Sequence, residues 1–186
     1  MIPSIQECYR LMDAYEMLDN IRAHSVVVAK VARVIAQGLR DAHIAICMET
    51  VTAGALLHDI GKTASLQTGE DHSEIGRQIC LDNRLDEIAP IVGEHVRLKG
   101  YSLNGGFSEK EIVFYADKRV KHDQIVSLDE RQAYIIERYG RGREDLMSAI
   151  RANFSLCSKV QDKLFKNLPF SPDALPHMAA DADILL

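Results

Sequence analysis

Cysteines are few in this sequence, and they form no recognisable motif. The four of them, Cys8, Cys47, Cys80 and Cys157, lie far apart, and no two make a CxxC pair. Zinc knuckles need closely spaced cysteines, and structural disulfides belong to oxidising compartments. We therefore expect reduced thiols in a cytoplasmic protein, which excludes a disulfide-framed secreted domain.

Long apolar runs are also missing. No stretch approaches the roughly 20 residues needed to span a bilayer. The first ten residues, MIPSIQECYR, lack the charged start and apolar stretch of a signal peptide. The formal net charge of −5 argues against nonspecific binding to DNA or to an acidic membrane. A small anionic substrate stays open, because a local site can oppose the global charge.

Alternating strand patterns are nearly absent, and the sequence shows no internal repeat or Gly/Ser linker. Helix signals recur instead. The S-x-x-E stretches at 4–7, 108–111 and 127–130 match the capping box, which marks helix starts. A chain of 186 residues, 47% of them hydrophobic, is long enough for one domain with a real core. We predict an all-α, single-domain helical bundle.

Apolar spacing and breaker residues place the expected helices. They cover residues 24–39, about 48–59, a segment from Asp71 across HSEIGRQICL, 85–96 with Pro90 kinking or splitting it, 108–122, 127–139 and 143–166. Gly61 is expected to end the second helix, and the Gly-rich residues 97–108 indicate a loop. Residues 1–170 would form the domain. Residues 171–186 would be a tail that either wraps the surface or is loosely ordered.

Histidines and aspartates gather near the ends of these helices. The candidates are His24, His58, Asp59, His72, His95 and Asp117. Bundles build metal sites from inward-facing groups on separate helices, and a thiolate-free set of imidazoles and carboxylates suits iron, manganese, zinc, nickel or cobalt. Six ligands exceed what one catalytic zinc uses. We therefore expect one or two divalent transition metals, with Asp59 as the bridge if there are two.

Two local features qualify this set. His58 and Asp59 are neighbours, and helix neighbours point about 100° apart, so they converge only across a groove or where the helix ends near Gly61. The other histidines, His43, His122 and His177, lie in polar, turn-like contexts. We interpret them as surface residues without a role, and the second His-Asp pair at 122–123 as a solvated turn.

The order of His24, the pair His58–Asp59 and Asp117 resembles the H…HD…D pattern of the HD-domain superfamily of metal-dependent phosphohydrolases. HDIGK is a frequent form of its central motif, and the resemblance covers about residues 20–125, before the C-terminal helices at 127–166. The motif order is most similar to the two-metal branch that includes the symmetrical diadenosine tetraphosphate hydrolases. The residues after His95 lack the histidine pair and GYP motif of the cyclic-di-GMP branch.

The resemblance implies an α-helical bundle with two metal positions. The first would be held by His24, His58, Asp59 and Asp117, and the second by His72 and His95. Metal-activated water would then cleave a phosphoester or phosphoanhydride of a nucleotide or similar small phosphate. Asp59 and Lys62 would be catalytic. The positions of Lys62, Arg97, Lys99 and Lys118 beside these ligands, and not the resemblance, lead us to expect that they bind the substrate phosphates, with Tyr101 against a base.

Two other functions stay open at this point. One is a catalytically silent HD-domain module for ligand binding or signalling. The other is a di-iron oxygenase on the same fold. The expected partner is a small phosphorylated molecule, with neither DNA nor membrane involved, and a homodimer is left open.

Overall fold

The computed structural model describes residues 1–180, 182 and 184 and confirms the all-α class. Its α-helices are α1 Ile5–Ala14, α2 Asp19–Asp41, α3 Met48–Leu57, α4 Lys62–Thr68, α5 His72–Asp82, α6 Ala89–Glu94, α7 Glu109–Lys118, α8 Leu128–Ile135, α9 Glu144–Phe165 and α10 Leu175–Ala180. The π-helix Ile136–Gly140 extends α8, and the 3₁₀ turn Pro172–Ala174 precedes α10. Strands β1 Val120–Lys121 and β2 Gln124–Ile125 pair antiparallel.

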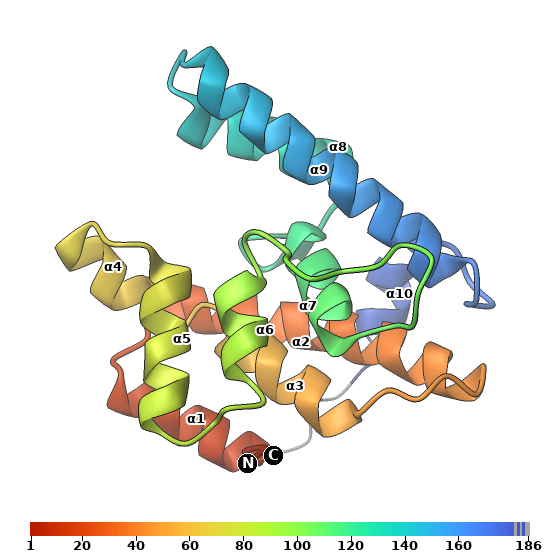
Figure 1. Cartoon of the computed structure of the whole chain (residues 1–186), viewed down its shortest axis with the longest axis horizontal. Coiled ribbons are helices and arrows are strands. Elements are labelled where there is room, and N and C mark those ends of the chain that lie inside the picture. The colour runs from red at the N-terminus through yellow and green to blue at the C-terminus, as the bar shows by residue number, and fades with distance from the viewer. Residues whose placement is uncertain (181, 183, 185–186) are drawn as a thin grey trace.

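The core lies where α2, α3 and α7 pack together (Figure 1). Residues 51–57 of α3 are all buried, which explains why this helix is apolar on every side. Helix α2 instead buries one face, including Val28, Ile35 and Leu39. Helices α5 and α6 pair beside this centre, and α8 and α9 form a hairpin that projects from it. His24 and Asp117 lie on two of these core helices, and His58 and Asp59 lie in the turn that follows the third.

The predicted helix starts are confirmed at the side-chain level. Ser4, Ser108 and Ser127 each cap their helix, and in each case the glutamate three residues later closes a full capping box. Asp71 caps α5 by accepting a hydrogen bond from the backbone N–H of Ser73. Each such cap stabilises a helix by about 1 kcal/mol, so these boundaries are encoded locally.

Gly61 and Pro90 have different roles from those expected. Gly61 does not end α3; it precedes α4, a helix that the sequence pattern did not predict. A Cβ atom at Gly61 would lie 2.3 Å from the carbonyl oxygen of His72, so the glycine allows α5 to approach closely. Pro90 lies in the first turn of α6, where its missing N–H costs nothing. It therefore starts a shorter helix instead of kinking a longer one.

The expected helix over 108–122 is also shorter. It ends at Lys118, and the β1–β2 hairpin follows, with His122 at a positive φ of 56° in its turn. The hairpin has only two residues in each strand, too few to produce an alternating pattern. The sequence consequently gave no signal for it.

Part of the predicted tail is folded onto the domain. Helix α10 packs against α2 and buries Leu175 and Ala179, so residues 172–180 are not loosely ordered. Residues 181, 183, 185 and 186 of the same tail lie outside the described residues, and the division at residue 170 stays a prediction. Within the described part of the chain, no helix is both long enough and apolar enough to cross a membrane.

A buried ion pair fixes the loop over residues 97–108. Lys163 of α9 donates to the carbonyl oxygens of Ser102 and Gly106, each at 2.7 Å, and to the Glu111 carboxylate at 2.8 Å. The Lys163 and Glu111 side chains are only 6% and 1% exposed. The loop is thereby tied to α7 and α9.

We expect Lys163→Met to destabilise the protein by about 3–5 kcal/mol, because it leaves the Glu111 carboxylate buried without its partner. Urea unfolding followed by circular dichroism would measure the change. Lys110→Met is the matched control, since the Lys110–Glu94 pair is more exposed and its loss should cost less. If Lys163→Met proves at least as stable as Lys110→Met, the ion pair with Lys163 does not offset the cost of burying the Glu111 carboxylate.

Candidate metal centre

The structure brings the six predicted ligands together. Two triads of potential ligand atoms form, and within each triad these atoms lie within 4.8 Å of one another. The first contains His24, His58 and Asp59, and the second contains Asp59, His72 and His95. Asp59 belongs to both, as a bridging carboxylate would. Their roles as metal ligands remain our proposal.

One end of the centre joins α2 to α7. His24 Nε2 lies 3.1 Å from Asp117 Oδ1, and His58 Nε2 lies 3.7 Å from the same oxygen. His58 is fully buried, while His24 and Asp117 are slightly exposed. Asp117 therefore lies beside the first triad as a fourth ligand candidate.

Asp59 faces both ends with different oxygens. Its Oδ2 lies 3.7 Å from His58 Nε2, whereas its Oδ1 lies 3.3 Å from His72 Nε2 and 3.5 Å from His95 Nε2. The two Nε2 atoms of His72 and His95 are 3.1 Å apart. Helix α3 ends at Leu57, so His58 and Asp59 lie in the turn that follows. They converge on the centre there, as expected for sequence neighbours at the end of a helix.

Backbone carbonyls orient three of the imidazoles. Nδ1 of His58 lies 2.7 Å from the Ala55 oxygen, and Nδ1 of His95 lies 2.6 Å from the Val92 oxygen. A carbonyl only accepts, so each Nδ1 donates and each Nε2 keeps a free lone pair toward the centre. Metal-bound histidines show this same outer hydrogen bond.

The third imidazole reveals a contribution that the sequence did not show. Nδ1 of His24 lies 2.8 Å from the carbonyl oxygen of His122, in the β1–β2 turn. The His122 side chain is exposed, as predicted, but its backbone orients His24. Any residue provides a carbonyl, so no sequence pattern could have indicated this role.

The charges suit a cation. Burial lowers the pKa of His58 to about 3, against the opposing effect of the Asp59 carboxylate, so the ring is neutral at pH 7. Burial would raise the pKa of Asp59, but the positive charge of the nearby Lys62 ammonium helps to hold that pKa well below its usual value. Burial likewise opposes ionisation of Asp117, while Lys118 and His24 keep its pKa low. Neutral imidazoles and ionised carboxylates are the forms that bind metal.

Two buried atoms at the centre lack partners. Among the described residues, His58 Nε2 and Asp59 Oδ1 have no hydrogen bond, although buried polar atoms are nearly always bonded. Both atoms belong to the triads. A divalent transition metal would satisfy them, so the residues present fit such an ion.

Two of the predicted cations lie at the carboxylates. Lys62 Nζ is 3.6 Å from Asp59 Oδ1. Lys118 Nζ is 3.1 Å from Asp117 Oδ2 and donates to the carbonyl oxygen of His95. The Lys118 side chain is buried, and its ammonium links Asp117 on α7 to His95, which directly follows α6. Binding of substrate by either lysine stays a prediction.

The other three predicted substrate contacts lie on the loop after His95. Lys99 donates its backbone N–H to Glu94, its carbonyl accepts from Lys110, and Tyr101 is 43% exposed. Arg97 is also exposed. In the part of the chain that the structure describes, no hydrogen bond or ion pair joins Arg97, Lys99 or Tyr101 to the ligand candidates. Their role in substrate binding stays a prediction.

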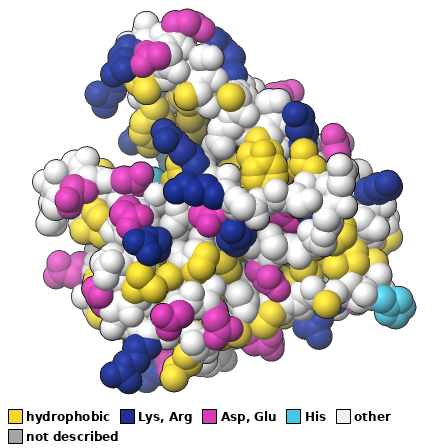
Figure 2. Space-filling view, in the orientation of Figure 1, with side chains coloured by type: hydrophobic (Ala, Val, Ile, Leu, Met, Phe, Trp, Pro, Cys, Tyr) yellow, Lys and Arg dark blue, Asp and Glu magenta, His cyan; other side chains and the backbone are white. Residues whose placement is uncertain are grey.

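A hollow separates helix α4 from the projecting α8–α9 hairpin (Figure 2). Histidine is visible in its depth, and lysine and arginine side chains lie along its edge. One arginine of the hairpin reaches the centre: Arg131 Nη2 is 4.0 Å from Asp117 Oδ1. No sequence pattern indicated Arg131, which is separated from Asp117 by the β1–β2 hairpin and the first turn of α8.

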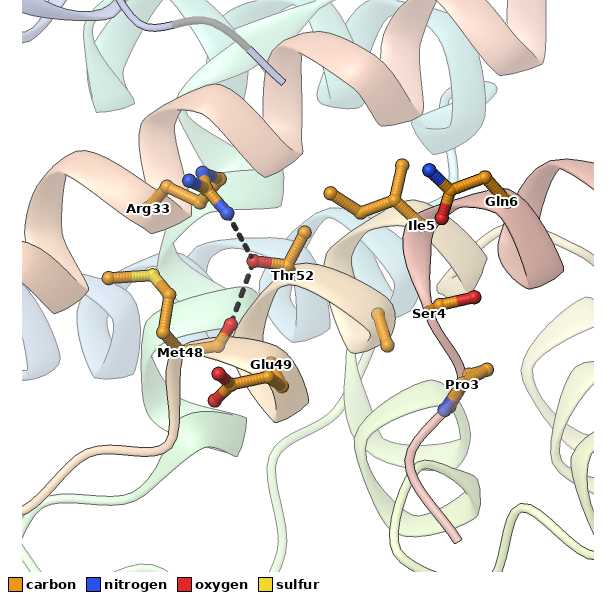
Figure 3. Close-up of a pocket in the computed structure, with 9 residues that line it drawn as sticks. Pro3, Ser4, Ile5, Gln6, Arg33, Met48, Glu49 and Thr52 are labelled. Carbon is orange, nitrogen blue, oxygen red and sulfur yellow. Dashed lines mark hydrogen bonds between the residues drawn. The ribbon is translucent and has the colours of Figure 1, made fainter. Parts of the chain in front are cut away.

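A second cavity, of about 370 Å³, lies between the first turns of α1 and α3 (Figure 3). Its cation, Arg33, donates to Thr52, whose hydroxyl donates to the carbonyl of Met48. Helix α3 rises 1.5 Å per residue, which puts Met48 about 15 Å from His58. This cavity is therefore separate from the metal centre.

Comparison with known proteins supports the sequence resemblance. Residues 21–134 match the HD domain family. The chain is also 28% identical to a tRNA (cytidine(56)-2'-O)-methyltransferase of Picrophilus torridus, over 90% of this chain and 51% of that protein. The chain thus spans about half the length of this relative. No solved structure matches.

Proposed function

Because the chain belongs to the HD domain family, we propose that it is a metal-dependent phosphohydrolase acting on a nucleotide or similar small phosphate. The observation that carries the proposal is the buried Asp59, shared by two triads of potential ligands. Two-metal sites clamp a phosphoryl group during in-line displacement. The arrangement of ligands supports that chemistry more specifically than the fold alone, since one fold hosts many functions.

The residues of the chain divide the work in this proposal. A bound divalent ion would lower the pKa of a coordinated water toward neutrality. Asp59 would hold both metal positions, and the neutral His58 would present Nε2 to the first of them. Lys62, beside Asp59, would neutralise charge on the phosphoryl oxygens. Phosphoryl transfer depends mainly on such positioning and charge stabilisation.

The name of the relative describes methyl transfer to a ribose oxygen of tRNA. This chain matches only 51% of that protein, so the activity in its name is not carried over, and the cluster of four imidazoles and two carboxylates supports hydrolysis. The similarity does agree with a substrate that contains a nucleotide. We therefore keep nucleotides and dinucleoside polyphosphates first among the candidates.

One set of measurements tests the proposal. The protein is purified without chelator, its metals are counted by elemental analysis, and phosphate release is screened with those metals. The panel contains nucleoside mono-, di- and triphosphates and diadenosine tetraphosphate. We expect metal-dependent turnover of at least one. Binding without turnover would favour the silent signalling module, and oxygen consumption with ferrous iron would favour the di-iron oxygenase.

A further inference from the structure

Arg131 has donors to spare at the metal centre. In the described part of the chain its guanidinium makes no hydrogen bond, and its 4.0 Å approach to Asp117 is too long for one. Yet the side chain is only 14% exposed. A guanidinium offers five N–H donors in a rigid fork, so this one is well placed to receive an anion in the hollow.

An aromatic neighbour, Tyr134, holds Arg131 in place. Its guanidinium carbon lies 5.5 Å from the centre of the Tyr134 ring, on the next turn of α8. Lys121 Nζ lies 5.0 Å from the same ring, and the His122 ring lies 5.3 Å from it. Stacking on an aromatic face fixes a guanidinium without consuming its N–H donors. The cation is thereby positioned but still able to bind.

Lys62 and Arg131 reach different carboxylates. Lys62 approaches Asp59, and Arg131 approaches Asp117. His58 Nε2 lies 3.7 Å from each of these aspartates, so it stands between them. The two cations therefore come to the centre from its two sides, one from α4 and one from α8. A substrate with two linked phosphates could therefore place one phosphate beside each cation.

We propose that Arg131, held by Tyr134, binds a phosphate next to the scissile one. The centre would then select substrates with linked phosphates, such as nucleoside diphosphates and polyphosphates, over monophosphates. This inference rests on the proposed function, since it assumes that the metal centre receives a phosphate. The guanidinium fork would take two oxygens of the neighbouring phosphate in charge-assisted hydrogen bonds.

Calorimetric titration of the metal-loaded protein tests this with two inorganic ligands. Imidodiphosphate carries two phosphoryl groups on a hydrolysis-resistant bridge, and inorganic phosphate carries one. We expect the wild type to bind imidodiphosphate more tightly. Arg131→Gln should weaken imidodiphosphate by about 10- to 100-fold, as for loss of hydrogen bonds to a charged group, and should change phosphate affinity by much less.

Two further variants serve as controls for Arg131→Gln. Arg143→Gln, at an exposed arginine of the same hairpin paired with Asp145, should bind both ligands like the wild type. Arg131→Lys keeps the charge but loses the fork, and should fall between wild type and Arg131→Gln. Circular dichroism and metal content are measured for all of them, so that a folding defect in Arg131→Gln is recognised and Arg131→Lys then decides.

The outcomes separate clearly. Equal loss of both ligands in the Arg131 variants, no loss of either, or a fall in metal content would overturn the inference, the last because Arg131 would act through Asp117. If the wild type keeps its preference for imidodiphosphate through Arg131 but releases phosphate from no substrate, the subsite stands and the proposed hydrolysis fails. If hydrolysis occurs and the Arg131 variants keep the wild-type preference for imidodiphosphate, the subsite fails and the proposed hydrolysis stands.

Discussion

Asp59→Ala is expected to reduce bound metal to near zero and to abolish hydrolysis. Asp59 is the residue that the two triads share, so its loss removes a ligand from both metal positions at once. It also leaves His72 and His95 without the carboxylate that both approach. His58→Ala should have the same result at the first position, because Nε2 of His58 lies close to both aspartates.

Elemental analysis and thermal unfolding measure this effect independently of activity. Metal at 100 times its dissociation constant should stabilise the wild type by about 2.7 kcal/mol per site, and this gain should vanish in Asp59→Ala. Asp123→Ala is the matched control, because it alters the other His-Asp pair, in the exposed β1–β2 turn. Wild-type metal content in Asp59→Ala would contradict the bridge.

Local patterns predicted the fold well where a short stretch fixes the outcome. Ser108 with Glu111 is one example, because a capping box needs only four consecutive residues. Gly61 was misplaced because glycine is compatible with either end of a helix, and Pro90 because proline can either interrupt a helix or stand in its first turn. The deciding contacts, such as the approach of α5 to Gly61, join segments that are distant in sequence.

The same distinction applies to the metal centre. The ligand candidates were recognisable because imidazoles and carboxylates beside apolar helices are costly unless they bind something. The His122 carbonyl and the Arg131 guanidinium were not, since both reach the centre only through the hairpin that follows α7. Lys118 was recognised as a nearby cation, but its contacts with Asp117 and His95 depend on how α6 and α7 pack.

His72→Ala and His95→Ala are each expected to leave about one metal per chain and to lower turnover by on the order of 100-fold or more, the scale of losing one electrostatic stabiliser of a transition state. Both residues belong only to the second triad. The first position keeps His24, His58, Asp59 and Asp117. This contrasts with Asp59→Ala, which should empty both positions.

Metal counting by elemental analysis, together with turnover of the best substrate, distinguishes one site from two. His177→Ala, at an exposed histidine of α10, provides a control for loss of an imidazole away from the centre. The double variant His72→Ala/His95→Ala should match the single variants in metal content. The second position has only Asp59, His72 and His95 as candidate ligands, so the loss of one histidine should already empty it. Two metals retained in the double variant would instead mean that His72 and His95 are not needed to hold the second ion, and full activity of that variant would mean that catalysis does not depend on them.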